Sequence, residues 1–174
     1  FRSATFTQHF VSREAYIWDG YMKAGETLIE VCIEESQERD ALIFPILFNY
    51  RHATEVAMKW LIDRYGSAFY RDVRYDKNHN LLELWRICRG MFDECGVTDV
   101  DAMDAVEQII LDFHELDKTG QKFRYSKSLD NKLFDLPSGQ IDLENLYWVM
   151  RGVNLFFEGS DGMLDGSIAN IGSL

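Results

Sequence analysis

The segment from residue 44 to residue 62 is typical of a helix that is apolar around more than half of its circumference. At about 100° per residue, its four most polar side chains fall within one wedge of roughly 100°. They are Arg51, His52, Glu55 and Lys59. The apolar remainder predicts that neighbouring helices cover this helix on most sides. Because a buried charge is costly unless it is paired, the wedge must be either an internal salt-bridge network or part of a site.

The length and the apolar content of the chain predict one folded domain. Hydrophobic residues make up 47% of the 174 residues, which is enough for a packed core and too much for a disordered chain. The formal net charge is −11, and this acidic balance argues against nucleic-acid binding by the overall charge of the domain. A local basic patch is compatible with it.

The cysteines and the lengths of the apolar runs indicate in which cellular compartment the protein is expected. The three cysteines, Cys32, Cys88 and Cys95, are odd in number and have no CxxC spacing, so neither a disulfide framework nor a zinc ribbon is expected. Reduced thiols are typical of cytoplasmic proteins. No apolar run approaches the ~20 residues that span a bilayer, so we expect a cytoplasmic protein that does not cross a membrane.

Periodicity of three to four residues dominates the chain, and the alternation typical of strands is scarce. The sequence therefore predicts an all-α fold, an up-and-down helical bundle of about five main helices. The expected helices cover residues 12–36, 38–65, 80–95, 98–119 and 143–158. We expect one bundle domain over residues 1–158 and a glycine-rich tail over residues 159–174, which is loosely ordered or forms a short extra element.

Capping and helix-breaking residues define the expected ends of these helices. Pro45 should kink the second helix or mark its start, Gly66 should end it, and Gly96 should close the third helix. The expected N-caps of the last three helices are Asn78, Thr98 and Asp142. The first helix should turn inward Ile17, Tyr21, Ala24, Leu28 and Val31. The fourth should turn inward Met103, Val106, Ile110 and Phe113.

Two interpretations of the polar wedge stay open. Steps of four residues stack Arg51 over Glu55 and Glu55 over Lys59, which is the spacing of helical ion pairs. An ion-pair network of this kind would tie the helix to the loop that contains Arg124. Alternatively, His52 and Glu55, at i and i+3, could bind a metal ion together. Two ligands make a poor metal site and no second such pair occurs, so we expect no metal and no cofactor.

A second candidate is a catalytic pair, Arg74 and His79, in the segment before the third helix. A histidine can activate a ribose 2′-hydroxyl or protonate a leaving oxygen, while an arginine stabilises charge that develops on a phosphate. Such a pair cleaves RNA without a metal ion. The alternative is that His79 merely starts a helix and Arg74 lies in a solvated loop.

A third candidate is the basic segment from residue 118 to residue 132. It holds five basic residues and one acid, a net charge of +4 in an acidic chain. The basic residues are Lys118, Lys122, Arg124, Lys127 and Lys132. Phe123 and Tyr125 lie among them, and basic residues with aromatic neighbours can hold phosphates and stack bases. The same segment could equally pack against acidic helices of its own chain.

Several segments of the chain resemble bacterial HEPN-like proteins. They are FPILFNYRHATEVAMKWLI, HNLLELW, FHELDKTGQKFRYSKS and IDLENLYWVM, within residues 40–157. The resemblance implies an all-helical up-and-down bundle that often dimerises, and many members are metal-independent ribonucleases of toxin–antitoxin and phage-defence systems. It implies as partners a second copy of the chain, RNA, and an antitoxin or other defence protein.

The HEPN-like signature is an arginine followed a few residues later by a histidine. Arg124 lies after the fourth helix, where the family's arginine is expected, but no histidine follows it. Arg74 and His79 have the required spacing before the third helix. Two functions therefore stay open. One is a defence or toxin-type ribonuclease, and the other is a non-catalytic helical module that dimerises or binds a partner.

Overall fold

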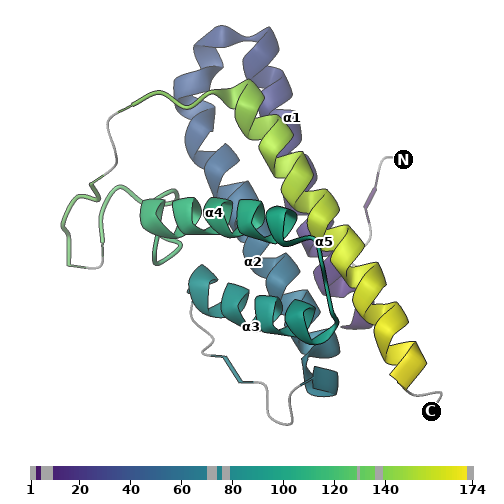
Figure 1. Cartoon of the computed structure of the whole chain (residues 1–174). Helices are drawn as coiled ribbons and strands as arrows, with labels where there is room; N and C mark the ends of the chain where they lie inside the picture. Colours follow the sequence, from purple (N-terminus) through teal and green to yellow (C-terminus); the bar gives the residue numbers. More distant parts are fainter. Residues whose placement is uncertain are drawn as a thin grey trace.

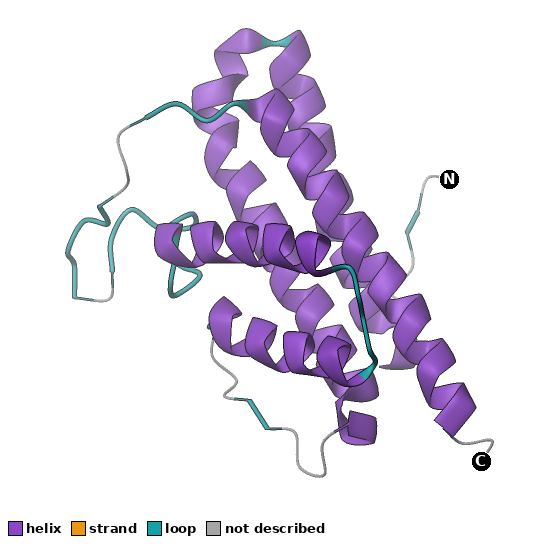
Figure 2. Ribbon diagram, in the orientation of Figure 1, coloured by secondary structure: helices purple, strands orange, loops and turns teal. Residues whose placement is uncertain are grey.

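The computed structural model describes residues 3–4, 10–69, 74–75, 79–128, 130–135 and 139–171. These residues form helices and loops without a β-strand, which confirms the predicted all-α fold (Figure 2). The helices are α1 (Phe10–Glu34), α2 (Arg39–Phe69), α3 (Leu81–Glu94), α4 (Val100–Leu116) and α5 (Leu143–Ile171), with a 3-10 turn at Ser36–Glu38 between α1 and α2. Within the described part of the chain, none of the helices has the length and apolarity needed to cross a bilayer.

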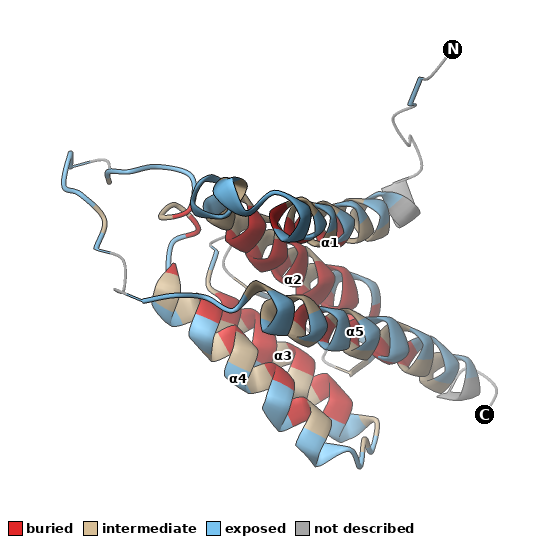
Figure 3. Ribbon diagram, turned by 90° about the horizontal axis from the view of Figure 1, so that it is seen from above, coloured by how far each residue is buried: buried red, intermediate tan, exposed pale blue. Residues whose placement is uncertain are grey.

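Helix α2 is the central element of the bundle. It packs against α1, α3 and α5, and α4 packs mainly against α3. Figure 1 shows α1, α2 and α5 as long neighbouring helices, with the hairpin of α3 and α4 lying across them. Figure 3 shows that α2 is buried along most of its length, as the apolar circumference of this segment predicts.

The ends of α2 and α5 differ from the prediction for one shared reason. Helix α2 contains Pro45 and continues through Gly66 to Phe69, so the expected end at Gly66 was wrong. On the other helix, Asp161 accepts hydrogen bonds from Trp60 Nε1 at 2.8 Å and from the Tyr65 hydroxyl at 2.7 Å. These contacts tie the last turns of α2 to α5 and keep both helices ordered.

The expected end of the fifth helix near residue 158 was also wrong, since α5 continues to Ile171. Residues 159–171 are therefore helical, not a loose tail. Leu164 is fully buried on this extension, and Arg64 of α2 pairs with Asp165 at 3.0 Å. The packing of this face offsets the low helix propensity of the glycines in the segment.

The inward face of α1 is rotated by one residue from the predicted stripe. The residues that turn fully inward are Trp18, Met22, Gly25, Ile29 and Cys32. Gly25 explains the rotation, because the ring of Tyr50 lies directly on it. A Cβ at Gly25 would be only 2.7 Å from Tyr50 Cε1, so the close approach of α1 to α2 requires glycine there.

Side-chain hydrogen bonds define the remaining helix starts. Asn80 caps α3 by accepting from the N–H of Leu82 and Glu83, and Asp99, not Thr98, caps α4. Asn78, the expected cap of α3, lies outside the described residues. The cap of α5 by Asp142 is confirmed, since its carboxylate accepts from the Asn145 N–H at 3.0 Å. The inward seam predicted for α4 is confirmed in full.

Gly96 closes α3 as predicted. Its φ is +73°, and its N–H donates to the Asp93 carbonyl at 3.0 Å. The N–H of Val97 donates to the carbonyl of Phe92 at 3.1 Å. This pair of hydrogen bonds is the Schellman motif, for which glycine is preferred.

Candidate functional site

Glu55 is the centre of a buried ion-pair network on α2. Its side chain is only 2% exposed. Oε2 accepts a hydrogen bond from Arg51 Nη1 at 3.1 Å, and Oε1 accepts one from Lys59 Nζ at 2.7 Å. The two pairs expected from the four-residue spacing are therefore both present. Arg51 is as deeply buried as Glu55, whereas the side chain of Lys59 is 24% exposed.

His79 joins this network from the start of α3. Its Nδ1 lies 2.9 Å from Oε1 and 3.1 Å from Oε2 of Glu55. The side chain is 49% exposed, so the imidazole lies at the boundary between the buried carboxylate and solvent. An ionised carboxylate only accepts hydrogen bonds, so the contact requires a proton on Nδ1, and Nε2 is the remaining ring nitrogen.

The charge of Glu55 is maintained by its neighbours. Burial alone would raise the pKa of this carboxyl group, but the hydrogen bond and positive charge of Lys59, together with His79, outweigh burial and hold the pKa below its ordinary value. Glu55 is therefore ionised at neutral pH. A buried carboxylate with three basic partners is the kind of group that fixes the orientation of an imidazole.

Arg51 connects three elements of the bundle. Besides Glu55, its guanidinium donates to the carbonyl of Asp117 at 2.9 Å and to the carbonyl of His79 at 2.8 Å. Gly120 lies against it with φ +71°, and a Cβ there would be 3.1 Å from Arg51 Nη1. The side chain therefore fixes α2 to the end of α4 and to the segment that precedes α3, and this places His79 on Glu55.

The other two residues of the predicted cluster, His52 and Arg124, form a separate stack. The rings of His52 and Phe48 are nearly parallel, with centroids 5.6 Å apart. Arg124 Cζ lies 5.4 Å from the ring centroid of Phe48 and 5.4 Å from that of Tyr125. The Nε of Arg124 donates to the carbonyl of Gly120 at 2.9 Å. The expected tie between α2 and the loop of Arg124 is thus made by ring contacts, while Arg51 of the ion-pair network donates to the backbone carbonyls of Asp117 and His79.

His52 and Glu55, proposed above as a pair of metal ligands, are not part of a group of side chains that suits a metal ion in the described part of the chain. His52 is stacked on Phe48, and its pKa is lowered, chiefly by burial, so the neutral imidazole is favoured. Both oxygens of Glu55 are engaged by basic partners. In the part of the chain that the structure describes, no three His, Cys, Asp or Glu side chains gather in a way that suits a metal ion.

Arg74 and His79, the predicted catalytic pair, have different surroundings. Arg74 is exposed in the segment between α2 and α3, whereas the hydrogen bonds of the His79 imidazole join it to Glu55. Close to them, the Tyr75 hydroxyl donates to Asp63 at 3.0 Å, which holds this segment against α2.

The four predicted phosphate-binding lysines lie on or near the segment after α4. Lys118 pairs with Glu115 at 3.3 Å, and Lys122 donates to the carbonyl of Asp135 at 3.2 Å. Lys127 and Lys132 are exposed, within a turn in which Lys127 forms an isolated bridge with Leu133. Lys127 and Lys132 are therefore open to solvent, whereas Lys122 is partly buried against its own loop and Lys118 is paired at the end of α4.

Sequence reasoning missed the contact between Glu55 and His79, which are 24 residues apart and were assigned to two different candidates. It also missed Phe48, whose ring links His52 to Arg124. One feature of the sequence could have indicated where His79 lies. Asn80 is a good N-cap residue, and a cap at Asn80 places His79 directly before the start of α3. Comparisons of the chain with protein-family models, with curated proteins and with solved structures found no match.

Proposed function

We propose that this chain is a HEPN-like, metal-independent endoribonuclease of the prokaryotic defence or toxin type, with His79 as its proton-transfer residue. The observation that carries the proposal is the pairing of a half-exposed imidazole with a buried carboxylate. A carboxylate that holds Nδ1–H leaves Nε2 as the basic nitrogen, and this is the form in which a histidine accepts a proton. The resemblance of the sequence to HEPN-like proteins implies the same class of reaction.

The reaction in this proposal is an internal transesterification of RNA. Nε2 of His79 takes the proton of a ribose 2′-hydroxyl, and the 2′-oxygen attacks the adjacent phosphorus. The bond from phosphorus to the 5′-oxygen breaks, and the imidazolium returns the proton to that leaving oxygen. Arg74, which is exposed in the same segment, stabilises the charge on the phosphate oxygens, and Glu55 is a positioning residue.

The lysines after α4 hold the RNA backbone in this proposal. Lys122, Lys127 and Lys132 provide local positive charge on an acidic protein, so binding should weaken steeply with added salt. A toxin of this type would have an antitoxin or another defence protein as its partner in the cell.

The test is cleavage of tRNA and total RNA by the purified chain in EDTA. The wild-type chain should release fragments with 2′,3′-cyclic phosphate and 5′-hydroxyl ends. H79A should lose at least about a hundredfold in rate, the usual contribution of a general base. R74A should also be slower, whereas R86A, an exposed arginine on α3, is the control. Equal cleavage by wild type and H79A, or no cleavage by the wild-type chain, would overturn the proposal.

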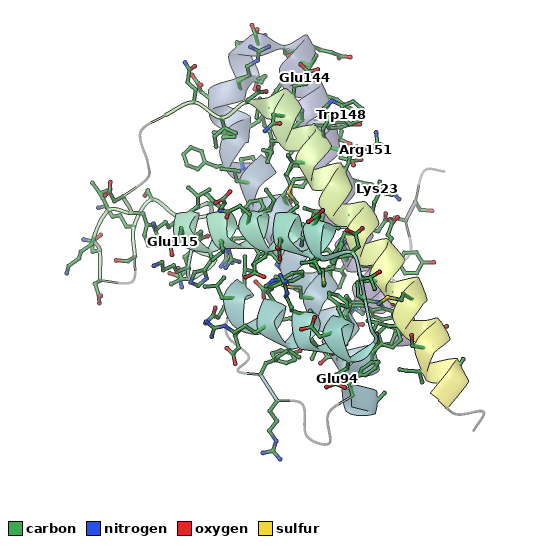
Figure 4. All side chains as sticks on the ribbon, in the orientation of Figure 1. Lys23, Glu94, Glu115, Glu144, Trp148 and Arg151 are labelled. Carbon is green, nitrogen blue, oxygen red and sulfur yellow. The ribbon has the colours of Figure 1, made fainter. Side chains whose placement is uncertain are left out.

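A second candidate function is a dimerisation module, and the outer face of α5 favours it. Seven exposed residues follow one another there at alternating steps of four and three. They are Trp148, Gly152, Leu155, Gly159, Gly162, Gly166 and Ala169. Trp148 is 60% exposed and Leu155 is 64% exposed. Figure 4 shows Trp148 and Arg151 along one side of α5, pointing away from α4. This repeat has the heptad spacing of a helix-packing seam.

The seam is complementary to a reversed copy of itself. In an antiparallel α5 pair centred between Leu155 and Gly159, each large side chain meets a glycine. Trp148 would lie opposite Gly166 of the second copy, and Leu155 would lie opposite Gly159. Among the residues that the structure describes, no atom outside these turns of α5 lies within 4 Å of a Cβ at Gly152, Gly159, Gly162 or Gly166, so these positions offer room for a partner.

Charges beside the seam fit the same pairing. Arg151 and Asp165 flank the seam on the same side, so a reversed copy would bring the two opposite charges together. Glu158, midway between them, would face its own copy, and Lys23 of α1 is close enough to Glu158 to offset part of that repulsion. The dimerisation module predicts a dimer that neither cleaves RNA nor arrests growth on expression.

A further inference from the structure

A pocket of about 450 Å³ opens between α2 and the segment that follows α4. Its walls are mainly aromatic and are completed by two cationic side chains. The residues concerned are Phe44, Phe123, Tyr125, Phe134, Lys122 and Arg124. Of the described residues that line it, none is acidic, although the chain as a whole carries a net charge of −11. The pocket therefore suits a flat, aromatic ligand that carries negative charge.

A series of stacked planar groups leads from α2 to this pocket. It begins with the ring of His52 on Phe48, continues with the guanidinium of Arg124 over Phe48, and ends with Tyr125, over whose ring Arg124 also lies. Tyr125 is 57% exposed. An aromatic ring that is supported from the protein side and exposed to solvent is a stacking platform for a base.

The turn of chain next to the pocket also lies close to the proposed catalytic residue. Arg124 is anchored on the carbonyl of Gly120, and a Cβ on Gly120 would lie 3.5 Å from the Cβ of His79. Because Gly120 binds Arg124 and also lies next to the Cβ of His79, one short turn separates His79 from the start of the pocket.

We propose that this pocket is a subsite for one unpaired base of RNA, next to the phosphate that His79 acts on. The inference rests on the proposed function, which makes RNA the substrate. The aromatic walls take the base, and Lys122 together with exposed Lys127 binds the adjacent phosphates. A base within a duplex is stacked on both faces and cannot enter, so the subsite selects single-stranded RNA.

The test is equilibrium binding of fluorescein-labelled eight-nucleotide RNA to H79A, which keeps the oligonucleotide intact. Single-stranded RNA should bind, and a duplex of the same sequence should bind at least about tenfold more weakly, as expected when a stacked base is lost. Y125A should weaken binding by about tenfold or more, and Y125F should restore it. Y16A is the matched control, because Tyr16 is an exposed tyrosine on α1.

An abasic oligonucleotide separates the base from the phosphates. Loss of affinity when one base is removed supports the subsite, whereas equal affinity means that only phosphates are bound and overturns it. Equal binding by H79A with and without Y125A also overturns it, as does the absence of any RNA binding. If RNA binds as described but the wild-type chain does not cleave it, the ribonuclease proposal fails and the subsite stands.

Discussion

Glu55 is a carboxylate held in the interior of the bundle by partners from its own helix and from the segment that precedes α3. Arg51 and Lys59 precede and follow it by one helical turn, and His79 reaches it from the start of α3. Removal of one partner from a buried ion pair leaves the other charges uncompensated, which costs more than the pair contributes when it is intact.

Glu55→Gln should therefore destabilise the protein strongly although the side chain keeps its shape. We expect the free energy of unfolding, measured by urea denaturation, to fall by about 3–5 kcal/mol. Asp19→Asn is the matched control, since Asp19 forms an exposed pair with Lys23 at the same four-residue spacing. The control should leave the urea midpoint unchanged. A normal midpoint for Glu55→Gln would show that the carboxylate is not essential to the fold.

His52 predicts a pH dependence of stability. Burial lowers its pKa in the folded chain below the ordinary value of 6.5, so the unfolded chain takes up the proton first as the pH falls. The stability contributed by the neutral ring is complete above pH 6.5 and is lost as the pH falls through the lowered pKa. Glu55 acts in the same direction, but only below its ordinary pKa of 4.5.

His52→Phe should flatten this dependence, because it keeps a ring on Phe48 and removes the titration. The free energy of unfolding of the wild-type chain should decrease from pH 7 to pH 5 more steeply than that of the variant, measured by urea denaturation at each pH. His114, whose pKa burial also lowers, remains in both proteins and accounts for the residual slope. Parallel profiles would contradict the role assigned to His52.

At the scale of the helices, alanine substitution at two glycines of α1 should have opposite effects on stability. A methyl group on Gly25 would lie 2.7 Å from the ring of Tyr50, whereas a methyl group on Gly20 would have no neighbour within 4 Å in the described part of the chain. Gly25→Ala should destabilise the protein by about 1–3 kcal/mol through overpacking. Gly20→Ala should stabilise it by about 0.5–1 kcal/mol, because alanine has less conformational entropy to lose in a helix. Thermal and urea unfolding of both variants measure the difference.

Helices α2 and α5 also determine each other's length. Asp161 accepts hydrogen bonds from the indole of Trp60 and from the hydroxyl of Tyr65, and Asp165 forms an ion pair with Arg64. Local propensity favours an end to α5 where glycines become frequent, but Leu164 and the contacts of Asp161 bury the opposite face of the same turns. The glycines remain on the exposed side, and they are therefore available to a partner.

At the scale of the whole molecule, the exposed seam of α5 predicts a dimer. The wild-type chain should have about twice its monomer mass of 20.3 kDa in light scattering or analytical ultracentrifugation. Gly159→Leu should give a monomer without loss of folding, since leucine is the better helix former but blocks the closest approach of two α5 helices. Glu158→Gln should tighten the dimer, because it removes the repulsion between two copies.

Ile33→Ala is the control for these variants, because Ile33 is an exposed apolar residue of α1 that is not part of the seam. It should leave the mass unchanged. A wild-type chain that stays monomeric at high concentration, or a Gly159→Leu variant that remains a dimer, would remove the seam of α5 as an interface.

The sequence by itself determined the helical class, the burial of α2 and the ion pairs within it. Those features depend on residues three or four positions apart, and a helix brings such residues together whatever surrounds it. The seam of α4, the cap at Asp142 and the closing turn at Gly96 are local in the same sense, and all three were predicted from neighbouring residues.

Only the tertiary structure decided which face of α1 turns inward, where α2 and α5 end, and that His79 meets Glu55. Each depends on a contact between residues far apart in the chain, such as Gly25 with Tyr50 or Trp60 with Asp161. Packing free energy at these contacts exceeds the few tenths of a kcal/mol per residue by which local helix propensities differ. The candidate site belongs to this second group, because its carboxylate lies on α2, its imidazole lies in the segment before α3, and the two meet only in the folded chain.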